Sequence, residues 1–429
     1  KGRGAFQDLD LDRAFADGAR YSETVAAGSD HAERKLLACN TALVDADVAH
    51  LMLPDEIQIQ PSEQPAKAPS GRMGSRRIAP PQDALSDAVD RVATAVRPMV
   101  IVGAGARHDM DAVVEFAEAI GAPVATTFKA KGQIADTHPL GCGVLGRSGT
   151  PVASWMMNEC DLLVVFGASF SNHTGVASYK PIVQIDRDPM ALGRFHSVDV
   201  ALQGDVAITA RALHAALAER PRAGADQRAE VAERWSIWRD EKARRLTDDR
   251  GRGVGAAAVF AAMTRQVPDD AVMCVDVGNN TYSFGRYFEV ADQDVLMSGY
   301  LGSIGFAFPA ALGAWAAVGS SRKVVSVSGD GGFGQYAMEL TTAVRYGMDI
   351  THVLLDNNEL GKISKEQRAA HFDVWQTPLQ NPDFASFADL CGATGISVSD
   401  PADLDAALTT AIATDGPALV HIRTDVGLL

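Results

Sequence analysis

The segment Gly329-Asp330-Gly331-Gly332-Phe333 and the later segment Asn357-Asn358-Glu359-Leu360-Gly361 decide the fold of this chain. Each closely follows an apolar run, at 324–327 and at 350–355, that predicts a buried strand. The interval between the two segments has room for one helix, predicted over 334–346. A right-handed strand–helix–strand unit then places both strand ends side by side at one edge of a parallel sheet.

The residue types at these strand ends suit a divalent cation and a phosphate. Mg²⁺ prefers oxygen ligands and binds through few protein groups plus phosphate oxygens. Asp330 offers a carboxylate oxygen, Asn357 an amide oxygen, and the main chain of Glu359 a carbonyl. Gly331 and Gly332 let the backbone approach a phosphate, and amides that open the next helix favour its negative charge. For either segment alone, an ordinary turn between strands remains an alternative.

Strand-like and helix-like runs alternate through the rest of the chain, which is typical of parallel sheets covered on both faces by helices. The fold class is therefore α/β with doubly wound parallel sheets. Further strands are predicted at 48–53, 99–102, 124–127, 162–166, 182–185, 272–275 and 418–422, and further helices at 32–45, 111–120 and 225–246. The predicted domains are a remnant at 1–60, a linker at 61–82, a Rossmann-like central domain at 83–218, a second linker at 219–252 and a diphosphate- and magnesium-binding domain at 253–429.

The composition narrows the functional class. The 429 residues carry 39 Lys and Arg against 54 Asp and Glu, a formal net charge of −15, which argues against a general nucleic-acid binder. The five cysteines are scattered without a CxxC pair, so we expect a cytoplasmic protein without a disulfide framework. The uncharged stretch 295–321 contains several glycines and Pro309, so we expect a buried loop leading into a core helix and no transmembrane segment.

The two opening segments resemble the GDG…NN signature of the thiamine-diphosphate-dependent enzymes. The stretch Gly302-Ser303-Ile304-Gly305 resembles the loop under the thiazolium ring in that family. The resemblance implies that the Gly302 carbonyl accepts from the pyrimidine amino group and that Ile304 wedges the cofactor into a bent shape. For Ile304 taken without the surrounding motif, a plain core position is the preferred interpretation. The segment 276–281 resembles the diphosphate-side loop of the family.

The resemblance implies thiamine diphosphate and Mg²⁺ as cofactors. The implied metal ligands are Asp330, Asn357 and Glu359. The implied cofactor-binding residues of the last domain are Gly278, Asn279, Asn280, Thr281, Gly302, Ile304, Gly329, Asp330, Gly331, Gly332, Asn357, Glu359, Leu360, Gly361 and Ile363.

Within the family, the resemblance is strongest to pyruvate oxidases, or pyruvate:quinone oxidoreductases, and to acetolactate synthases. The opening segment with Phe6 and Gln7 resembles the end of the pyrimidine-binding domain near the active site. The segment 360–367 resembles the pyruvate-oxidase stretch that follows the metal-binding Asn, and Glu366 falls on its active-site acid. The implied catalytic residues are Glu366, Ile304, Gly302, Gln7 and Phe6. For Glu366, a charge on a solvated helix face beside Lys362 and Lys365 is the alternative.

Two segments of the central domain carry a resemblance that implies a second cofactor. The segments 127–132 and 184–189 resemble pyruvate oxidase and imply FAD. The implied contacts are Gly103, Gly105, Lys129, the loop 143–149, Asp186 and Asp205. Two departures weaken this expectation, because residue 108 is His where GxGxxG needs Gly, and Lys362 stands where pyruvate oxidases have an aromatic residue. Ordinary turns and surface residues remain the alternative.

The expected function is thiamine-diphosphate- and Mg²⁺-dependent decarboxylation of a small, pyruvate-like 2-oxo acid, with electrons passed to FAD. The alternatives are a non-redox, acetolactate-synthase-like carboligase or lyase, and an inactive scaffold that only binds cofactor. The resemblance implies a homodimer or homotetramer with active sites at the subunit interface. The family's activating glutamate is expected upstream of residue 1, so the 429-residue chain alone is expected to be inactive.

Overall fold

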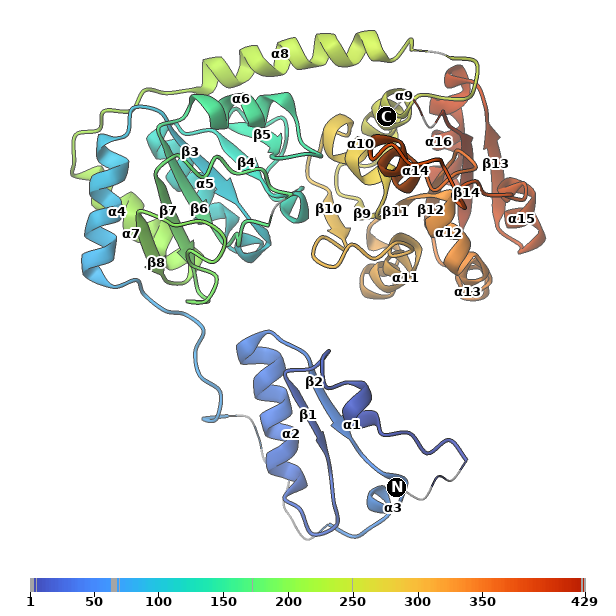
Figure 1. Cartoon of the computed structure of the whole chain (residues 1–429), viewed down its shortest axis with the longest axis horizontal. Helices are drawn as coiled ribbons and strands as arrows, with labels where there is room; N and C mark the ends of the chain where they lie inside the picture. Colours follow the sequence, from blue (N-terminus) through green and yellow to red (C-terminus); the bar gives the residue numbers. More distant parts are fainter. Residues whose placement is uncertain are drawn as a thin grey trace. The chain divides into compact units, whose positions relative to one another are not determined.

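The computed structural model describes residues 4, 6–62, 68, 70–171, 173–248, 250–425 and 427. They form two compact units, an N-terminal unit within 1–78 and a C-terminal unit within 79–429 (Figure 1). The N-terminal unit pairs β1 (Tyr21–Thr24) with β2 (Ala49–Met52) in parallel. Its helices are α1 (Leu11–Ala14), α2 (His31–Asn40), which continues as a π-helical turn at Thr41–Asp45, and α3 (Asp55–Gln58).

The C-terminal unit begins with a six-stranded parallel sheet in the order β5-β4-β3-β6-β7-β8. Its strands are β3 (Pro98–Val102), β4 (Val124–Thr126), β5 (Gly141–Val144), β6 (Leu162–Phe166), β7 (Ile182–Asp186) and β8 (Val200–Gln203). Its helices are α4 (Gln82–Thr94), α5 (Met110–Ile120), α6 (Pro151–Glu159) and α7 (Val206–Ala218). The strand order reverses between β3 and β6, which is where open α/β sheets bind ligands.

The second sheet is also six-stranded and parallel, in the order β10-β9-β11-β12-β14-β13. Its strands are β9 (Val272–Val275), β10 (Asp294–Met297), β11 (Val324–Gly329), β12 (Ile350–Asp356), β13 (Thr394–Val398) and β14 (Ala418–Arg423). Its helices are α9 (Ala256–Gln266), α10 (Asn279–Tyr287), α11 (Ala307–Val318), α12 (Asp330–Tyr336), α13 (Leu340–Arg345), α14 (Gly361–Ala369), α15 (Phe384–Leu390) and α16 (Leu404–Ala413). Two wholly parallel sheets confirm the predicted fold class.

One long helix joins the two sheets. α8 (Arg228–Arg245) buries Trp235 and Trp238, and Trp235 Nε1 donates to the Gly141 carbonyl at 2.7 Å while Trp238 stacks on Tyr287. A continuous core of buried apolar side chains runs between the sheets. The predicted helix 225–246 is thereby confirmed, and its two tryptophans contact the start of β5 in the first sheet and the end of α10 beside the second.

The differences from the sequence-based elements have physical causes. The single helix predicted over 334–346 was wrong, because the chain turns helical already at Asp330 and a break at Tyr336, with φ of −130°, separates α12 from α13. The strands β1, β5, β8, β10 and β13 were not predicted, and all five are sheet edges. Edge strands need less apolar sequence than central ones, so their signal is weak.

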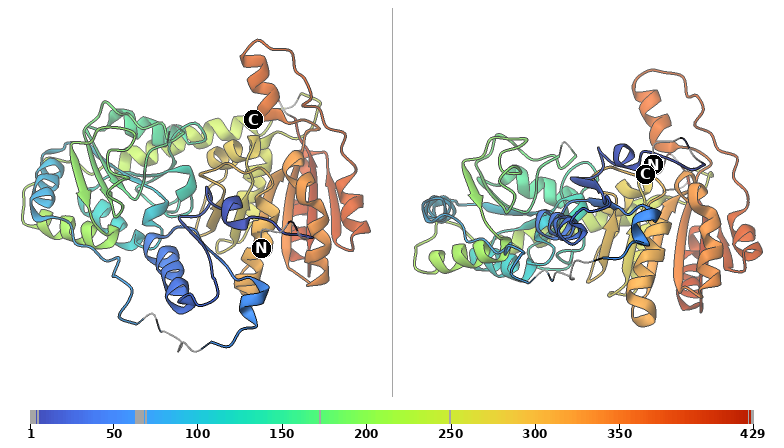
Figure 2. Two further views of the ribbon diagram at one scale, coloured as in Figure 1. Left: turned by 60° about the horizontal axis from the view of Figure 1, so that its bottom comes forward. Right: turned by 90° about the horizontal axis from the view of Figure 1, so that it is seen from below.

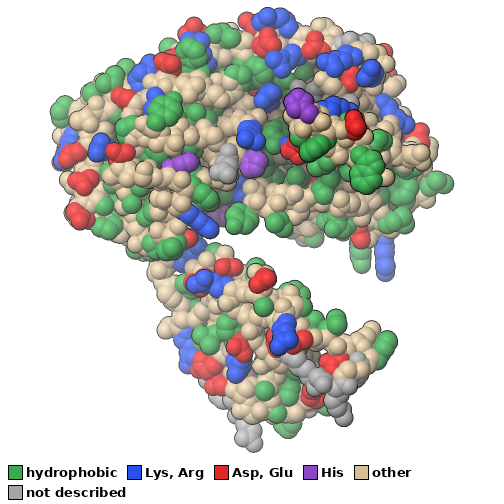
Figure 3. All heavy atoms as spheres, in the orientation of Figure 1, with side chains coloured by type: hydrophobic (Ala, Val, Ile, Leu, Met, Phe, Trp, Pro, Cys, Tyr) green, Lys and Arg blue, Asp and Glu red, His purple; other side chains and the backbone are tan. Residues whose placement is uncertain are grey.

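Three further features describe the helices and the exterior of the structure. Among the described residues, no helix combines the length and the apolar character needed to cross a bilayer. On the face of the C-terminal unit shown in Figure 3, acidic and basic side chains are interspersed. In Figure 2, α14 and the loop that follows it stand out from the body of this unit.

Candidate active site

Neighbouring strand ends of the second sheet carry the residues that the sequence singles out. β11 and β12 pair with Gly329 opposite Leu355, which confirms that the two segments lie side by side. Asp330 is buried, and its Oδ2 accepts a 2.7 Å hydrogen bond from Asn381 Nδ2. The same nitrogen donates to Oδ1 of Asp356 at 2.8 Å. One amide therefore bridges two buried carboxyl groups.

These two carboxyl groups differ in their charge preference. Burial raises the pKa of Asp330 to about 6, and the neighbouring Asp356 adds to the rise while Asn381 opposes it. Burial acts on Asp356 in the same direction, but hydrogen bonds from His421 and Asn381 outweigh it and hold its pKa at about 2. His421 Nε2 lies 2.8 Å from Asp356 Oδ2, and Arg423 donates to that oxygen at 2.9 Å. Asp330 has no cationic side chain among its described partners, so a bound cation would favour its ionised form.

Glycines at the start of α12 bring its backbone close to neighbouring groups. A Cβ at Gly332 would lie 2.5 Å from Asp276 Oδ2, and a Cβ at Gly331 would lie 2.5 Å from Leu360 Cδ2. Side chains other than hydrogen would therefore displace the groups that line this turn. Such close backbone approach is what a phosphate-binding loop requires.

Asp276 connects the end of β9 to the loop before α11. Its Oδ1 accepts from the amides of Val277 at 2.6 Å and Gly305 at 2.8 Å, while Oδ2 is buried without a hydrogen-bond partner among the described residues. Burial raises the pKa of Asp276, and the amide hydrogen bonds oppose that rise. Sequence reasoning placed Asp276 in the segment that resembles the diphosphate-side loop but did not name it as a site residue. Its position directly after a buried strand was the available signal.

The diphosphate-side loop is held largely by its own side chains. Gly278 has φ of +145°, which glycine adopts without strain, and the helix α10 starts at the next residue. Asn280 Nδ2 donates to the Asp276 carbonyl at 3.1 Å, and the Thr281 hydroxyl donates to the same oxygen. Asn280 and Thr281 thus stabilise the loop, whereas Asn279 Nδ2 is buried without a described partner.

The loop between β10 and α11 carries the predicted ring-side residues. Gly302 has φ of +72° and lines a cavity of about 460 Å³ between the two sheets. Ile304 is 41% exposed, so it is not a plain core residue. Tyr300 and Leu301 are more exposed still, and the expectation of a buried loop here was wrong. Loops at strand ends run over the surface because their backbone polar groups need water.

The second strand end forms a turn on an asparagine side chain. Asn357 Oδ1 accepts from the Glu359 amide at 3.0 Å. The Glu359 carboxylate pairs with Arg368 at 3.2 Å. The main-chain carbonyl of Glu359 accepts from the Gly361 amide at 2.8 Å, which leaves its second lone pair for a metal ion. Leu360 covers Gly331, and Ile363 is partly exposed on α14. Mg²⁺ prefers hard oxygen donors. The site offers the Asp330 carboxylate, which has no cationic partner among the described residues, the Asn357 amide oxygen and the Glu359 carbonyl. These residues therefore fit Mg²⁺ and a diphosphate.

A buried histidine packs against the helix that begins at the glycine-rich turn. His352 lies between the hydroxyls of Ser326, at 2.6 Å, and Ser328, at 3.0 Å. Burial lowers the pKa of His352 to about 3, so it stays neutral. Phe333 of α12 stacks on its ring with centroids 4.6 Å apart. This contact anchors the glycine-rich turn to the sheet.

The residues proposed for FAD are only partly brought together. Gly103 and Lys129 line the 460 Å³ cavity, whereas Gly105 packs on Gly167. Asp205 caps α7 by accepting from the Ile208 amide at 3.1 Å. Asp186 accepts from the Asp188 amide at 2.9 Å, and burial raises its pKa. Neither aspartate lines the cavity.

Of the remaining predicted catalytic residues, Glu366 belongs to the C-terminal unit, where it lies outside this cluster, and Phe6 and Gln7 belong to the N-terminal unit. Glu366 is exposed on α14 and pairs with Lys362, which lowers its pKa. Phe6 and Gln7 belong to the N-terminal unit, where Phe6 is exposed and Gln7 has φ of +62°. Sequence reasoning missed Asn381, His421 and Asp356 as partners of the metal-site carboxylate. Asp356 directly precedes Asn357 in the sequence, whereas only the tertiary structure brings Asn381 and His421 to this place.

Comparisons with known proteins agree with this geometry. The central domain of thiamine pyrophosphate enzymes matches residues 85–213, and their C-terminal TPP-binding domain matches residues 276–422. The putative thiamine pyrophosphate-containing protein YdaP of Bacillus subtilis is 31% identical over 98% of this chain and 73% of its own length. The chain belongs to the thiamine pyrophosphate enzyme family. The predicted family is confirmed.

Other members of the thiamine pyrophosphate enzyme family among the relatives carry a synthase name. The large subunit of acetolactate synthase isozyme 2 of Escherichia coli is 32% identical over 80% of this chain and 63% of its own length. The acetolactate synthase large subunit of Parasynechococcus marenigrum is 30% identical over 82% of this chain and 58% of its own length. The chain thus spans less than two thirds of each of these two synthase subunits.

Proposed function

We propose that the protein containing this chain uses thiamine diphosphate and Mg²⁺ in a non-redox, acetolactate-synthase-like carboligation. In that reaction two 2-oxo acids give one 2-hydroxy-3-oxo acid and CO₂. The bound cofactor supplies the electron sink for loss of CO₂. The buried Asp330 at the β11–β12 edge carries the proposal, because its carboxyl lacks a described cationic partner and stands beside a glycine turn. The synthase names of the relatives favour carboligation over the expected flavin-linked oxidation.

The chain's residues take defined roles in this proposal. Asp330, the amide oxygen of Asn357 and the Glu359 carbonyl hold the metal ion. The turn at Gly331 and Gly332 admits the diphosphate. The Gly302 carbonyl and the half-exposed Ile304 orient the rings. Because Lys362 lowers the pKa of Glu366, that carboxylate stays ionised at neutral pH and acts as a hydrogen-bond acceptor and a weak base, not as an acid.

The test combines binding with product analysis. Calorimetric titration with thiamine diphosphate should show Mg²⁺-dependent binding that Asp330→Ala removes. Pyruvate should then yield acetolactate, measured as acetoin after acid treatment. Release of CO₂ without a carboligation product contradicts the proposal, and so does failure to bind the cofactor.

Flavin-linked oxidation is the second candidate, and the 460 Å³ cavity favours it. Gly103 and Lys129 line one side of the cavity, and Gly278 and Gly302 line the other, so a ligand there would touch both sheets. The protein purified without added flavin should then be yellow and be bleached by pyruvate. A colourless protein that forms acetolactate excludes this candidate.

A size-exclusion measurement with light scattering tests the proposed homodimer or homotetramer.

A further inference from the structure

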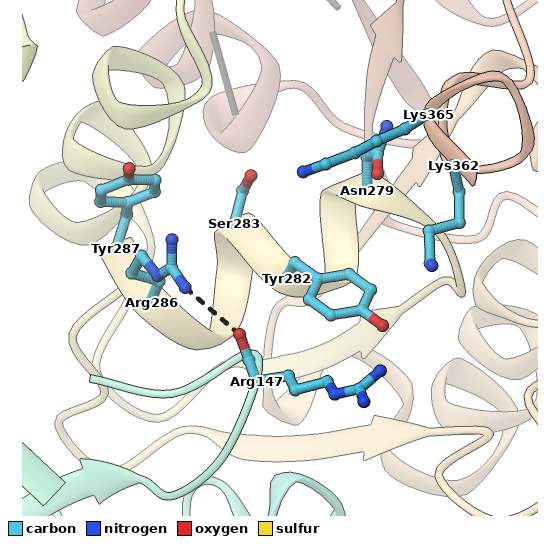
Figure 4. A pocket seen from close by; sticks show the side chains of 8 residues that line it. All are labelled: Arg147, Asn279, Tyr282, Ser283, Arg286, Tyr287, Lys362 and Lys365. Carbon is cyan, nitrogen blue, oxygen red and sulfur yellow. Dashed lines mark hydrogen bonds between the residues drawn. The ribbon is translucent and has the colours of Figure 1, made fainter. Parts of the chain in front are cut away.

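A second, smaller cavity lies beside the diphosphate-side loop. Its volume is about 240 Å³, and α10, α14 and the turn after β5 surround it (Figure 4). Tyr282 lines both this cavity and the larger one, so the two spaces adjoin at its ring. The lining residues are Arg147, Asn279, Tyr282, Ser283, Arg286, Tyr287, Lys362 and Lys365.

The polar wall of this cavity is one face of a helix. Asn279, Tyr282, Ser283 and Arg286 stand at intervals of three and four residues along α10, which places their side chains in one row. The opposite wall comes from Lys362 and Lys365, one turn apart on α14. Three separate elements therefore direct polar groups into one small space.

The charge of this space is strongly positive in a chain whose net charge is −15. It holds four cations, and among the described residues only Lys362 has a carboxylate partner, Glu366. Arg286 donates instead to the main-chain oxygen of Arg147 at 3.2 Å, and Lys365 is exposed without a described partner. Like charges this close repel one another unless an anion joins them.

Two neutral groups of the same wall also lack partners. Ser283 is buried, and its Oγ makes no hydrogen bond to any described residue. Asn279 Nδ2 is likewise buried and unpaired. Buried polar atoms without partners are rare and costly in folded proteins. The Ser283 hydroxyl, which has no part in the proposed cofactor site, is independent evidence that the cavity is built around a polar ligand.

We infer that this cavity binds the distal anionic group of one of the two 2-oxo acids joined in the proposed carboligation, and that this acid carries at least two negative charges. The inference rests on the proposed function, because it names the substrate class of the same site. A carboxylate or a phosphate at the far end of a 2-oxo acid has the size and charge that four cations and two neutral donors in about 240 Å³ would hold. The reacting keto group would then lie on the other side of Tyr282, towards Gly278 and Gly302.

A matched pair of acids tests the inference without catalysis. 2-Oxoglutarate and 2-oxovalerate share a five-carbon 2-oxo acid skeleton and differ in the distal carboxylate. We expect calorimetry on the full chain to show about 5-fold tighter binding of 2-oxoglutarate, weakening with added salt. Inorganic phosphate is the third probe, since its competition distinguishes a phosphate-bearing acid from a dicarboxylic acid.

The variants assign the effect to the cavity. Lys365→Gln should abolish the preference for 2-oxoglutarate, and Lys365→Glu should reverse it. Arg222→Gln removes one exposed positive charge after α7 and should leave the preference intact. Equal affinity for the two acids overturns the inference, and so does a preference that survives both Lys365 variants or falls equally in Arg222→Gln.

Failure of this inference is distinguishable from failure of the proposed function. Titration of the same samples with thiamine diphosphate and Mg²⁺ reports on the cofactor site alone. Cofactor binding without a preference between the two acids overturns only the cavity's assignment. A preference lost in Lys365→Gln, in a protein that binds no cofactor, supports the anion site and overturns the carboligase proposal.

Discussion

Replacing Asp330 by Asn separates the stability of the cofactor-free chain from its capacity for a metal ion. Asp330 is buried with a pKa raised to about 6, so a neutral side chain of the same shape avoids the cost of ionising it. The same change removes the charged ligand that we propose for Mg²⁺. We therefore expect Asp330→Asn to raise the thermal midpoint of the cofactor-free chain above pH 6 and to abolish Mg²⁺-dependent binding of thiamine diphosphate.

The sign and size follow from the pKa of Asp330. Because the folded-state pKa lies above the ordinary 3.8, the folded chain loses stability as the pH rises from about 4 to about 6. A rise of about 2 in pKa corresponds to about 3 kcal/mol at higher pH. Asn has one acceptor oxygen where Asp has two, and the lost hydrogen bond reduces the gain in stability by about 1 kcal/mol. The net gain of about 2 kcal/mol raises the midpoint by roughly 3 °C, because the compact unit within 79–429 has a large unfolding entropy.

Thermal unfolding in EDTA at about pH 4.5 and about pH 8 measures this difference, and the advantage of Asn should grow by about 2 kcal/mol between them. Asp292→Asn removes an exposed carboxylate near β10 and serves as the control for net charge. The histidine contributions are common to wild type and variant and cancel in the comparison. The reasoning is refuted if the difference in midpoint is the same at both pH values, or if the Asn variant keeps metal-dependent cofactor affinity.

Three further predictions concern the turn and its supports. Gly332→Ala places a Cβ 2.5 Å from Asp276 Oδ2 and should weaken cofactor binding about 10-fold or more in calorimetry. The control Gly334→Ala, whose Cβ meets nothing within 4 Å, should leave cofactor binding unchanged. Equal affinities of the two variants contradict this prediction. Asp276→Ala leaves the amides of Val277 and Gly305 without their acceptor, at about 1–3 kcal/mol each, so hydrogen exchange should quicken in 302–306 but not in β12. Unchanged exchange in that loop would count against the anchoring role. Burial lowers the pKa of His352 to about 3, so in scanning calorimetry the stability of wild type relative to His352→Phe should fall by about 1.4 kcal/mol per pH unit as the pH drops below about 6.5. A constant gap between the two proteins from neutral to acid pH shows that His352 is not the titrating group.

Short-range patterns were sufficient for the central strands. β9, β11, β12 and β14 are nearly continuous apolar runs, because central strands of a parallel sheet are covered on both faces. The edge strands β10 and β13 lack such runs and escaped prediction. The helical break at Tyr336 also left no local sign, because its neighbours are ordinary helix formers.

The sequence by itself determined the α/β class, the family resemblance and the kinds of ligand atoms at the ends of β11 and β12. Only the tertiary structure decided which groups meet those atoms. Asn381 reaches Asp330 and Asp356 from a distant part of the chain, and Asp276 ties β9 to the amide of Gly305. The basic cavity likewise needs α10, α14 and the turn at Arg147 together. The physical reason is that these contacts depend on the order of the strands in the sheet, and a local pattern of residues carries no record of that order.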